Sequence, residues 1–185
     1  MTVVMQTAPA AVPAATVHAT GEAIDPHAFR AALGQFTTGV TVITALAPDG
    51  ALVGITANSF NALSLDPPLV LWSLRESSPS LHVFEQSDRF VVNVLSEAQI
   101  EVSRRFASPI ADKFDGVPHA ESAHGLPLLH SAAAWFECRT LVRQKAGDHV
   151  LYIAEVDRFT ASEQAPLVFH SGGYHALGSR LEGKL

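Results

Sequence analysis

Two long β-rich runs joined by a three-residue turn constrain the fold of this chain most strongly. Residues 133–145 (AAWFECRTLVRQK) and 149–160 (HVLYIAEVDRFT) are rich in β-branched and aromatic residues, and AGD separates them. A link this short predicts an antiparallel strand pair, because parallel neighbours need a long crossover connection. Alternation in the first run places Phe136, Cys138, Thr140 and Val142 on one face and Trp135, Glu137, Arg139 and Arg143 on the other.

The earlier part of the chain repeats this organisation with shorter elements. Residues 40–46 and 51–57 flank the turn signal PDG and predict a hairpin. Further strands are expected at 69–74, 89–95 and, followed by a glycine turn, at 166–170. Short helices are predicted at 25–36 with Asp25 as cap and Pro26 in the first turn, at 78–86 with Ser78 as cap, and at 96–107 with Ser96 and Gln99 as a capping box. Residues 58–68 and 107–127 are expected to be irregular.

Six or so strands with hairpin links and few helices predict a mainly β fold, a closed antiparallel barrel in a single domain. The 185 residues suit one domain with tails. We expect an N-terminal tail at residues 1–22, the domain at 23–180 and a short C-terminal tail at 181–185.

Composition excludes several functional classes. A net charge of −6 argues against a nucleic-acid surface, and no long apolar run follows a basic flank, so no membrane span is expected. The lone Cys138 rules out an internal disulfide, suits a reducing cytoplasm and is expected to be a buried structural thiol. Dinucleotide, phosphate-loop and nucleophile-elbow motifs are absent. His119, His124 and His130 match no common zinc spacing, so surface histidines are favoured over a metal site.

Three polar clusters remain as candidates for chemistry. The stretch GITANSF, residues 54–60, carries Thr56, Asn58 and Ser59 at a strand end. SLRESSPS, residues 73–80, leads into a predicted helix whose N-terminus suits an anion, although its serines also serve as simple caps. GDH, residues 147–149, opens the second long strand, where a solvated turn histidine is the alternative.

The first two clusters together suit a flavin mononucleotide. A ring with amide edges could lie along the first cluster, with its phosphate at the second. A cofactor of this kind also explains why GITANSF carries no acid or base, because the cofactor supplies the chemistry.

The chain resembles the short-chain flavin reductase family, the reductase components of two-component flavin monooxygenases. The resemblance covers residues 25–178 and is carried by an ordered set of segments. These are FRAALGQFTTGVTVIT, GITANSFNALSLDPPLVLWSL, FVVNVL, SRRFA, DKFDG, GDHVLYIAEV and PLVFHSGGY. It implies an FMN-binding split β-barrel of antiparallel, Greek-key topology with a few short flanking helices, and a cytoplasmic homodimer.

The same resemblance implies NAD(P)H-dependent reduction of FMN or FAD. Reduced flavin would pass to a separate oxygenase that hydroxylates aromatic compounds. The implied flavin contacts are Gly54, Ile55, Thr56, Asn58 and Ser59 for the ring and ribityl chain, Ser73, Arg75 and Ser80 for the phosphate region, and Phe106 and Lys113 closing over the flavin. The implied nicotinamide contacts are His149, which positions the ring, with Phe169, His170, Ser171, Gly172 and Tyr174.

Two other functions share this fold. Related split barrels oxidise pyridoxine phosphate or bind flavin tightly as electron carriers, and a non-enzymatic flavin- or haem-binding protein is a third possibility. The sequence has no obvious cluster of arginines to bind the 2′-phosphate of NADPH, which favours NADH as the reductant. The choice between FMN and FAD, the partner oxygenase and its substrate stay open at this level.

Overall fold

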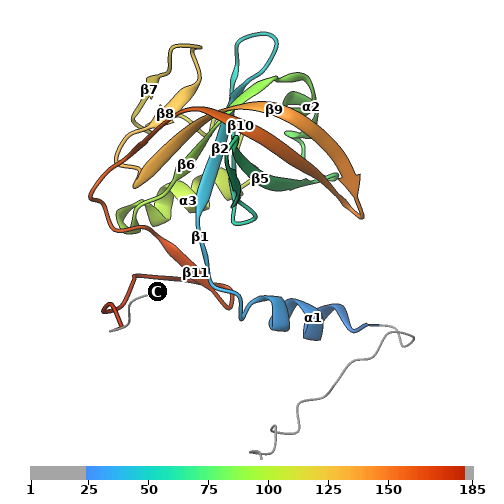
Figure 1. Cartoon of the computed structure of the whole chain (residues 1–185), viewed down its shortest axis with the longest axis vertical. Helices are drawn as coiled ribbons and strands as arrows, with labels where there is room; N and C mark the ends of the chain where they lie inside the picture. Colours follow the sequence, from blue (N-terminus) through green and yellow to red (C-terminus); the bar gives the residue numbers. More distant parts are fainter. Residues whose placement is uncertain (1–23, 182–185) are drawn as a thin grey trace, which may run out of the picture.

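A curled antiparallel sheet forms the body of the molecule in the computed structural model, which describes residues 24–181 (Figure 1). Its seven strands pair in the order β3-β2-β6-β9-β10-β5-β4. Their bounds are β2 (Thr41–Leu46), β3 (Leu52–Ala57), β4 (Asn61–Leu65), β5 (Pro68–Arg75), β6 (Arg89–Val94), β9 (Ala134–Ala146) and β10 (His149–Ala161). Every pairing is antiparallel, which confirms the mainly β, antiparallel prediction.

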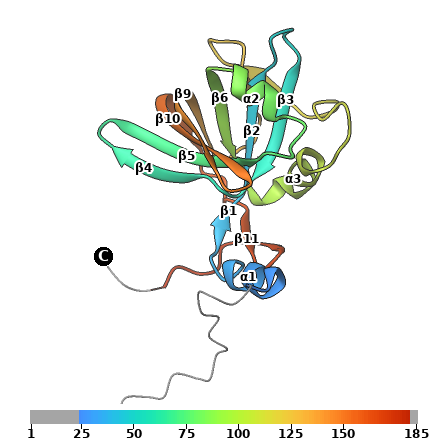
Figure 2. The ribbon, with the colours of Figure 1, turned by 90° about the vertical axis from the view of Figure 1, so that its right-hand side faces the viewer.

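The sheet has two edges and is not closed by backbone pairing, so the closed barrel predicted from the strand pattern is wrong. Strands β3 and β4 stand at opposite ends of the strand order. Figure 2 shows the β4–β5 hairpin extending away from the barrel body. Ser59, just after β3, reaches across to β5, where its hydroxyl bonds the backbone of Ser73. The contact between the Ser59 hydroxyl and the Ser73 backbone therefore links β3 to β5 where a closed barrel would have backbone hydrogen bonds between strands.

Short elements surround this sheet. A three-stranded sheet contains β1 (Thr38–Gly39), β11 (Val168–His170) and β12 (Gly173–His175), and a two-stranded one contains β7 (His119–Glu121) and β8 (Pro127–Leu129). The helices are α1 (Pro26–Leu33), α2 (Leu81–Gln86), the 3₁₀ turn η1 (Glu97–Gln99) and α3 (Ile100–Ala107).

Two of the three predicted helix starts are confirmed. The Asp25 carboxylate accepts the N–H groups of His27 and Ala28 at 3.0 and 3.4 Å. The capping box of Ser96 and Gln99 is present, although a 3₁₀ turn precedes the α-helix. The predicted cap Ser78 is wrong, because α2 begins at Leu81 and Ser80 takes the cap position. The Ser78 hydroxyl instead accepts the N–H of Ser80 at 3.3 Å.

Aromatic packing fills the barrel interior. Trp72 of β5 stacks on Tyr152 of β10 with ring centroids 4.7 Å apart, and both side chains are fully buried. Cys138 is buried in the same cluster, as predicted, and burial raises the pKa of its thiol. A second cluster, between β2 and α3, contains Phe106 and Phe114.

The sequence pattern misjudged β4, β7 and β9. Strand β7 lies wholly within residues 107–127, which were expected to be irregular. β4 lies inside residues 58–68, also expected to be irregular, and its residues are mostly exposed, so no alternation of apolar side chains marks it. In β9 a register shift against β10 occurs at Leu141, which interrupts the predicted apolar face. Cys138 is consequently fully buried, whereas Val142 is 41% exposed.

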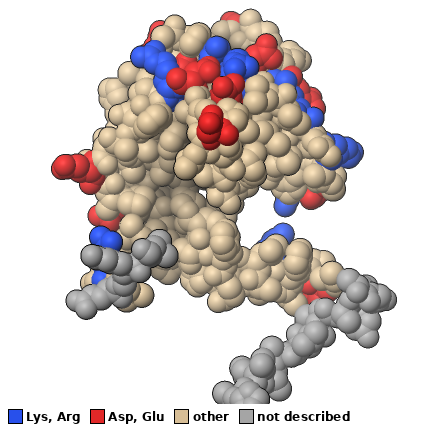
Figure 3. Space-filling view, viewed as in Figure 1, with Lys and Arg blue, Asp and Glu red and all other residues tan. Residues whose placement is uncertain are grey.

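The helix α1 lies apart from the barrel, on the far side of β1 and β11 (Figures 1 and 2). None of its residues is buried. Phe29 is 53% exposed, Leu33 58% and the following Phe36 72%. Figure 3 shows an open gap between this segment and the barrel.

The predicted tails fall almost entirely outside the described residues, apart from Leu181. None of the helices between residues 24 and 181 has the length and apolar character needed to cross a bilayer. The same part of the chain holds no group of three or more His, Cys, Asp or Glu residues arranged for a metal ion. His124 donates instead to the buried carboxylate of Glu137 at 2.5 Å.

Candidate functional site

A hollow of about 360 Å³ lies where β3 and β5 end beside the start of β10. We call it the strand-end hollow. Its lining residues are Ile55, Thr56, Ala57, Asn58, Ser59, Ser73, Leu74, Arg75, Ser77, Ser78, Pro79 and His149. Seven of the predicted site residues are therefore brought together here: Ile55, Thr56, Asn58, Ser59, Ser73, Arg75 and His149.

Strand pairing and one serine assemble this hollow. His149 lies opposite Arg75 in the β5–β10 ladder, which brings the GDH turn beside the end of β5. The Ser59 hydroxyl donates to the carbonyl of Ser73 at 2.9 Å and accepts its N–H at 3.0 Å. This reciprocal pair holds the segment after β3 against β5, so the two serine-rich segments face one cavity.

The hydroxyls of the GITANSF segment are already engaged within the protein. Thr56 donates its hydroxyl to the carbonyl of Ser103 in α3 at 2.7 Å. The backbone N–H groups of Asn58 and Ser59, in contrast, form no hydrogen bond with any described residue. Ligand contacts through these backbone donors and through the Thr56 and Ser59 hydroxyls stay predictions.

The imidazole of His149 contacts the carboxylate of its neighbour Asp148. Its Nδ1–H donates to the Asp148 carboxylate at 2.7 Å, and the imidazole side chain is 37% exposed. The same hydrogen bond lowers the pKa of Asp148 below its ordinary value, so this carboxylate is ionised at neutral pH. Because a carboxylate only accepts hydrogen bonds, Nδ1 of His149 is the donor in this contact.

Gly54, Ser80 and Lys113 line a different hollow, of about 460 Å³, beside α2 and the loop after α3. The Lys113 ammonium donates to the carbonyls of Phe106 at 2.8 Å and Gly54 at 3.3 Å, and burial lowers its pKa. The two hollows adjoin, since Pro79 lines both. Lys113 therefore anchors the back of β3 and does not reach the strand-end hollow.

Phe106 is placed differently from its predicted role. Its side chain is fully buried and packs edge-on against Phe114 at 4.9 Å. A Cβ on Gly54 would stand only 2.4 Å from this ring, so the ring fills the space that glycine leaves. Phe106 supports β3 from behind and cannot close over a ligand in this structure.

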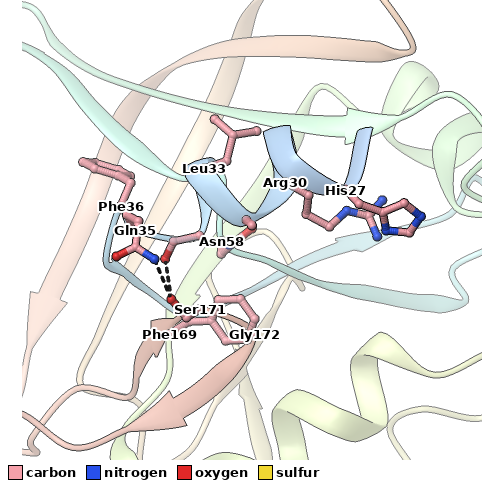
Figure 4. Close-up of a pocket in the computed structure, with 11 residues that line it drawn as sticks. His27, Arg30, Leu33, Gln35, Phe36, Asn58, Phe169, Ser171 and Gly172 are labelled. Atoms are coloured by element: carbon pink, nitrogen blue, oxygen red, sulfur yellow. Dashed lines mark hydrogen bonds between the residues drawn. The ribbon is translucent and has the colours of Figure 1, made fainter. Parts of the chain in front are cut away.

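A third hollow, of about 550 Å³, lies between α1 and the β11–β12 turn, and we call it the helix hollow (Figure 4). Phe169, Ser171 and Gly172 of the predicted nicotinamide contacts line it. Asn58 lines this hollow as well as the strand-end hollow, so the two are neighbours. His149 belongs only to the strand-end hollow, and the predicted nicotinamide residues are accordingly divided between the two.

His170 and Tyr174 are engaged in the scaffold. Both ring nitrogens of His170 lie within hydrogen-bond distance of hydroxyls, Nδ1 of Thr37 at 3.0 Å and Nε2 of Ser171 at 3.2 Å. The Tyr174 hydroxyl bonds that of Ser103 in α3 at 2.8 Å. Nicotinamide contacts by these two side chains stay predictions, and their observed role is to fix the C-terminal hairpin.

Sequence reasoning missed the helix α1 as a wall of the site. His27 and Arg30 line the helix hollow. Their spacing of one helical turn could have indicated a shared face, but nothing in the sequence shows which element that face meets.

The comparison with protein families agrees with this geometry. The sequence matches the profile of the flavin reductase like domain over residues 33–178. The chain belongs to this family. All three hollows lie mainly within the matched residues, with only the α1 positions before residue 33 outside them.

Several curated flavin reductase relatives are similar over most of this chain. It is 45% identical to a probable flavin reductase of Rhizobium meliloti over 165 residues, which are 89% of this chain and 52% of that protein. It is 44% identical to a flavin reductase of Pseudomonas putida over 153 residues, 82% of this chain and 90% of that one. The chain thus spans about half the length of the first relative and nearly all of the second.

Solved flavin reductase structures have the same fold. The styrene monooxygenase flavin reductase from Pseudomonas putida S12 superposes with a TM-score of 0.74 at 38% identity, over 83% of this chain and 99% of that chain. The NADH:FAD oxidoreductase of Streptomyces globisporus C-1027, solved with NAD and FAD fragments, has a TM-score of 0.80 at 31% identity, over 87% and 99% of the two chains. The predicted fold class is confirmed at this level.

The residues at the strand-end hollow fit a flavin. Free N–H groups at Asn58 and Ser59 are the donors that an amide-edged ring requires. Arg75 lines the same hollow with no described carboxylate within ion-pair distance, although its charge contributes to the lowered pKa of Asp148.

Proposed function

We propose that this chain is an NAD(P)H-dependent flavin reductase that uses FMN or FAD and takes NADH in preference to NADPH. The observation that carries the proposal is the strand-end hollow. It joins free backbone donors at Asn58 and Ser59 with the unpaired Arg75 and the oriented imidazole of His149. Its membership of the flavin reductase like family supports the same activity.

In this proposal the protein orients two reactants and performs no acid–base step. The flavin supplies a two-electron acceptor for the hydride of the reduced nicotinamide. Asn58 and Ser59 would hold the ring edge, and Arg75 the phosphate. His149 would accept the carboxamide N–H of the nicotinamide at Nε2, because Asp148 occupies Nδ1. Holding two reacting rings in contact is itself a large contribution to rate.

Reduced flavin is proposed to leave the protein for a separate oxygenase. Relatives include the reductase components of flavin-dependent monooxygenases, such as that for trigonelline in Acinetobacter baylyi, 42% identical over 145 residues. These names support a role in the hydroxylation of aromatic compounds. We place the protein in the cytoplasm because its lone cysteine is a buried free thiol.

We further propose that the protein is a homodimer. Phe29 of α1, which lines none of the three hollows, is 53% exposed. Leu65 at the tip of the β4–β5 hairpin is 94% exposed, and Phe159 of β10 is 70% exposed. Large apolar side chains in such numbers are typical of an interface. A monomer mass in light scattering at micromolar concentration would reject the dimer.

Flavin-dependent oxidation of NADH is the test of the proposed activity. Purified protein is mixed anaerobically with NADH and a dye acceptor, with and without added FMN. We expect dye reduction to depend on flavin and to saturate with flavin concentration. Equal rates with and without flavin, or no rate in either case, would reject the proposal.

A tightly bound flavin carrier is the alternative. It shares the hollow but would retain flavin through purification and dialysis. Retention of stoichiometric flavin after dialysis would favour the carrier.

A further inference from the structure

We propose that Arg30 on α1, assisted by His27, binds the diphosphate of the nicotinamide dinucleotide in the helix hollow. The inference rests on the proposed function, because it assigns a position to the remote part of that reductant. Arg30 and His27 line the same hollow as Ser171 and Gly172 of the C-terminal turn. Neither side chain belongs to the set that sequence reasoning assigned to the nicotinamide.

The helix hollow and the strand-end hollow are neighbours, and in this proposal they form one cleft. Asn58 contributes to the walls of both. His149 lies in the strand-end hollow and Arg30 in the helix hollow, so the cleft has a polar end beside the flavin site and a cationic end on α1. A dinucleotide has the matching order of groups, with an uncharged carboxamide at the reacting ring and two phosphates further along.

Hydrogen bonds hold the end of α1 against the C-terminal turn although no residue of the helix is buried. The Ser171 N–H donates to the Gly34 carbonyl at 3.0 Å, and the Gln35 amide donates to the Ser171 hydroxyl at 3.3 Å (Figure 4). Thr37 and His170 add a contact of 3.0 Å. The wall that carries Arg30 is therefore positioned by the same turn that supplies Ser171 and Gly172.

Arg30 differs from most arginines of this chain in having no carboxylate partner. Ion pairs occupy five other arginines: Arg89, Arg104, Arg105, Arg139 and Arg143. Among the described residues, no carboxylate lies within ion-pair distance of Arg30, although acidic residues outnumber basic ones by 18 to 12. An unpaired guanidinium on the wall of a hollow is available to an external anion.

The chemistry of the diphosphate explains why a cation is needed at this place. The chain has a net charge of −6, so its overall field repels an anionic dinucleotide. A guanidinium offers a planar set of donors that matches two phosphate oxygens, and its charge is retained at any working pH. His27 lies three residues before Arg30, one helical turn away on the same side, and adds an imidazole donor.

Steady-state kinetics of Arg30→Ala test the assignment at saturating flavin. We expect the KM for NADH to rise about tenfold with an unchanged kcat, since a bond to the remote phosphates is equal in ground and transition states. Arg30→Lys should recover part of the loss. N-benzyl-dihydronicotinamide, which carries the reacting ring but no phosphate, should be oxidised equally well by Arg30→Ala and the unchanged protein.

Arg158→Ala is the matched control, because Arg158 is an exposed arginine of β10 that lines none of the three hollows. An unchanged KM for NADH in Arg30→Ala would overturn the proposal. Three other results for Arg30→Ala would also overturn it. They are an equal loss of activity with the benzyl analogue, a rise in KM for NADPH but not for NADH, and a changed oligomeric mass. If the unchanged protein shows no flavin-dependent NADH oxidation, the proposed function fails first, and the two failures are distinguishable.

Discussion

Replacing Gly54 with alanine tests the support behind the candidate flavin site. The new Cβ would stand 2.4 and 2.6 Å from two ring carbons of Phe106, and 3.4 Å from Phe114. The first two distances are too short for two carbon atoms that are not bonded to each other, so the Phe106 ring or β3 must move. Because Phe106 is fully buried and packed against Phe114, the ring has no free space to enter.

Overpacking of this kind costs about 1–3 kcal/mol of stability. For a domain of this size, each kcal/mol lowers Tm by roughly 2–4 °C. We expect Gly54→Ala to shift the urea midpoint accordingly, with an unchanged m-value. Flavin binding should weaken as well, since Ile55, the next residue, lines the strand-end hollow.

A double-mutant cycle with Phe106→Leu separates the clash from other effects of the added methyl group. The smaller leucine opens space in front of Gly54, so Gly54→Ala should cost less in the leucine background than in the unchanged protein. Equal costs in the two backgrounds would refute the close contact. A loss below about 0.5 kcal/mol for Gly54→Ala alone would do the same, because surface substitutions commonly fall in that range.

Other predictions follow from the strand-end hollow and the core. His149→Ala should raise the KM for NADH or slow hydride transfer by about tenfold, or ~1.4 kcal/mol, with little change in flavin affinity; wild-type stopped-flow behaviour would leave His149 without a role. Ser59→Ala should weaken flavin binding about tenfold by releasing Ser73, measurable by fluorescence titration. Burial raises the pKa of the Cys138 thiol in the folded protein. The protonated thiol therefore contributes fully to stability below the pKa of the unfolded thiol, and this contribution is lost as the pH rises above that unfolded value. Cys138→Ala should flatten this alkaline loss in urea unfolding curves. Leu65→Ser should weaken the dimer in sedimentation experiments, whereas Gly39→Ser, at a position with open space for a Cβ, should not.

Local signals were sufficient for the two main hairpins. The β2–β3 hairpin follows from β-branched residues around PDG, where Gly50 takes a positive φ of 84°. The pairing of β9 with β10 follows from their length and short turn. The β5–β10 ladder that brings Arg75 beside His149 joins segments far apart in the chain, so local signals did not predict it and only the family resemblance pointed to a shared site.

Contacts between distant segments were beyond that reasoning. Gly54 meets Phe106, and Lys113 bonds carbonyls on both segments, only because α3 packs behind β3. Nothing in a single sequence indicates which helix covers which strand. The burial of Glu137 also escaped prediction, since alternation assigned it to the same face as Arg139 and gave no sign of the loop that covers it.

Anaerobic bleaching of free FMN by NADH, with flavin in large excess over protein, is the most direct measurement of flavin reduction and release. The loss of the visible flavin absorption band measures reduction. The fraction of the total flavin that is bleached shows whether reduced flavin leaves the protein and is replaced by oxidised flavin. A reductase that releases its product bleaches all the flavin, at a rate proportional to protein concentration. Bleaching that stops after one equivalent of flavin per protein chain, or that proceeds at the rate without protein, would contradict the proposed function.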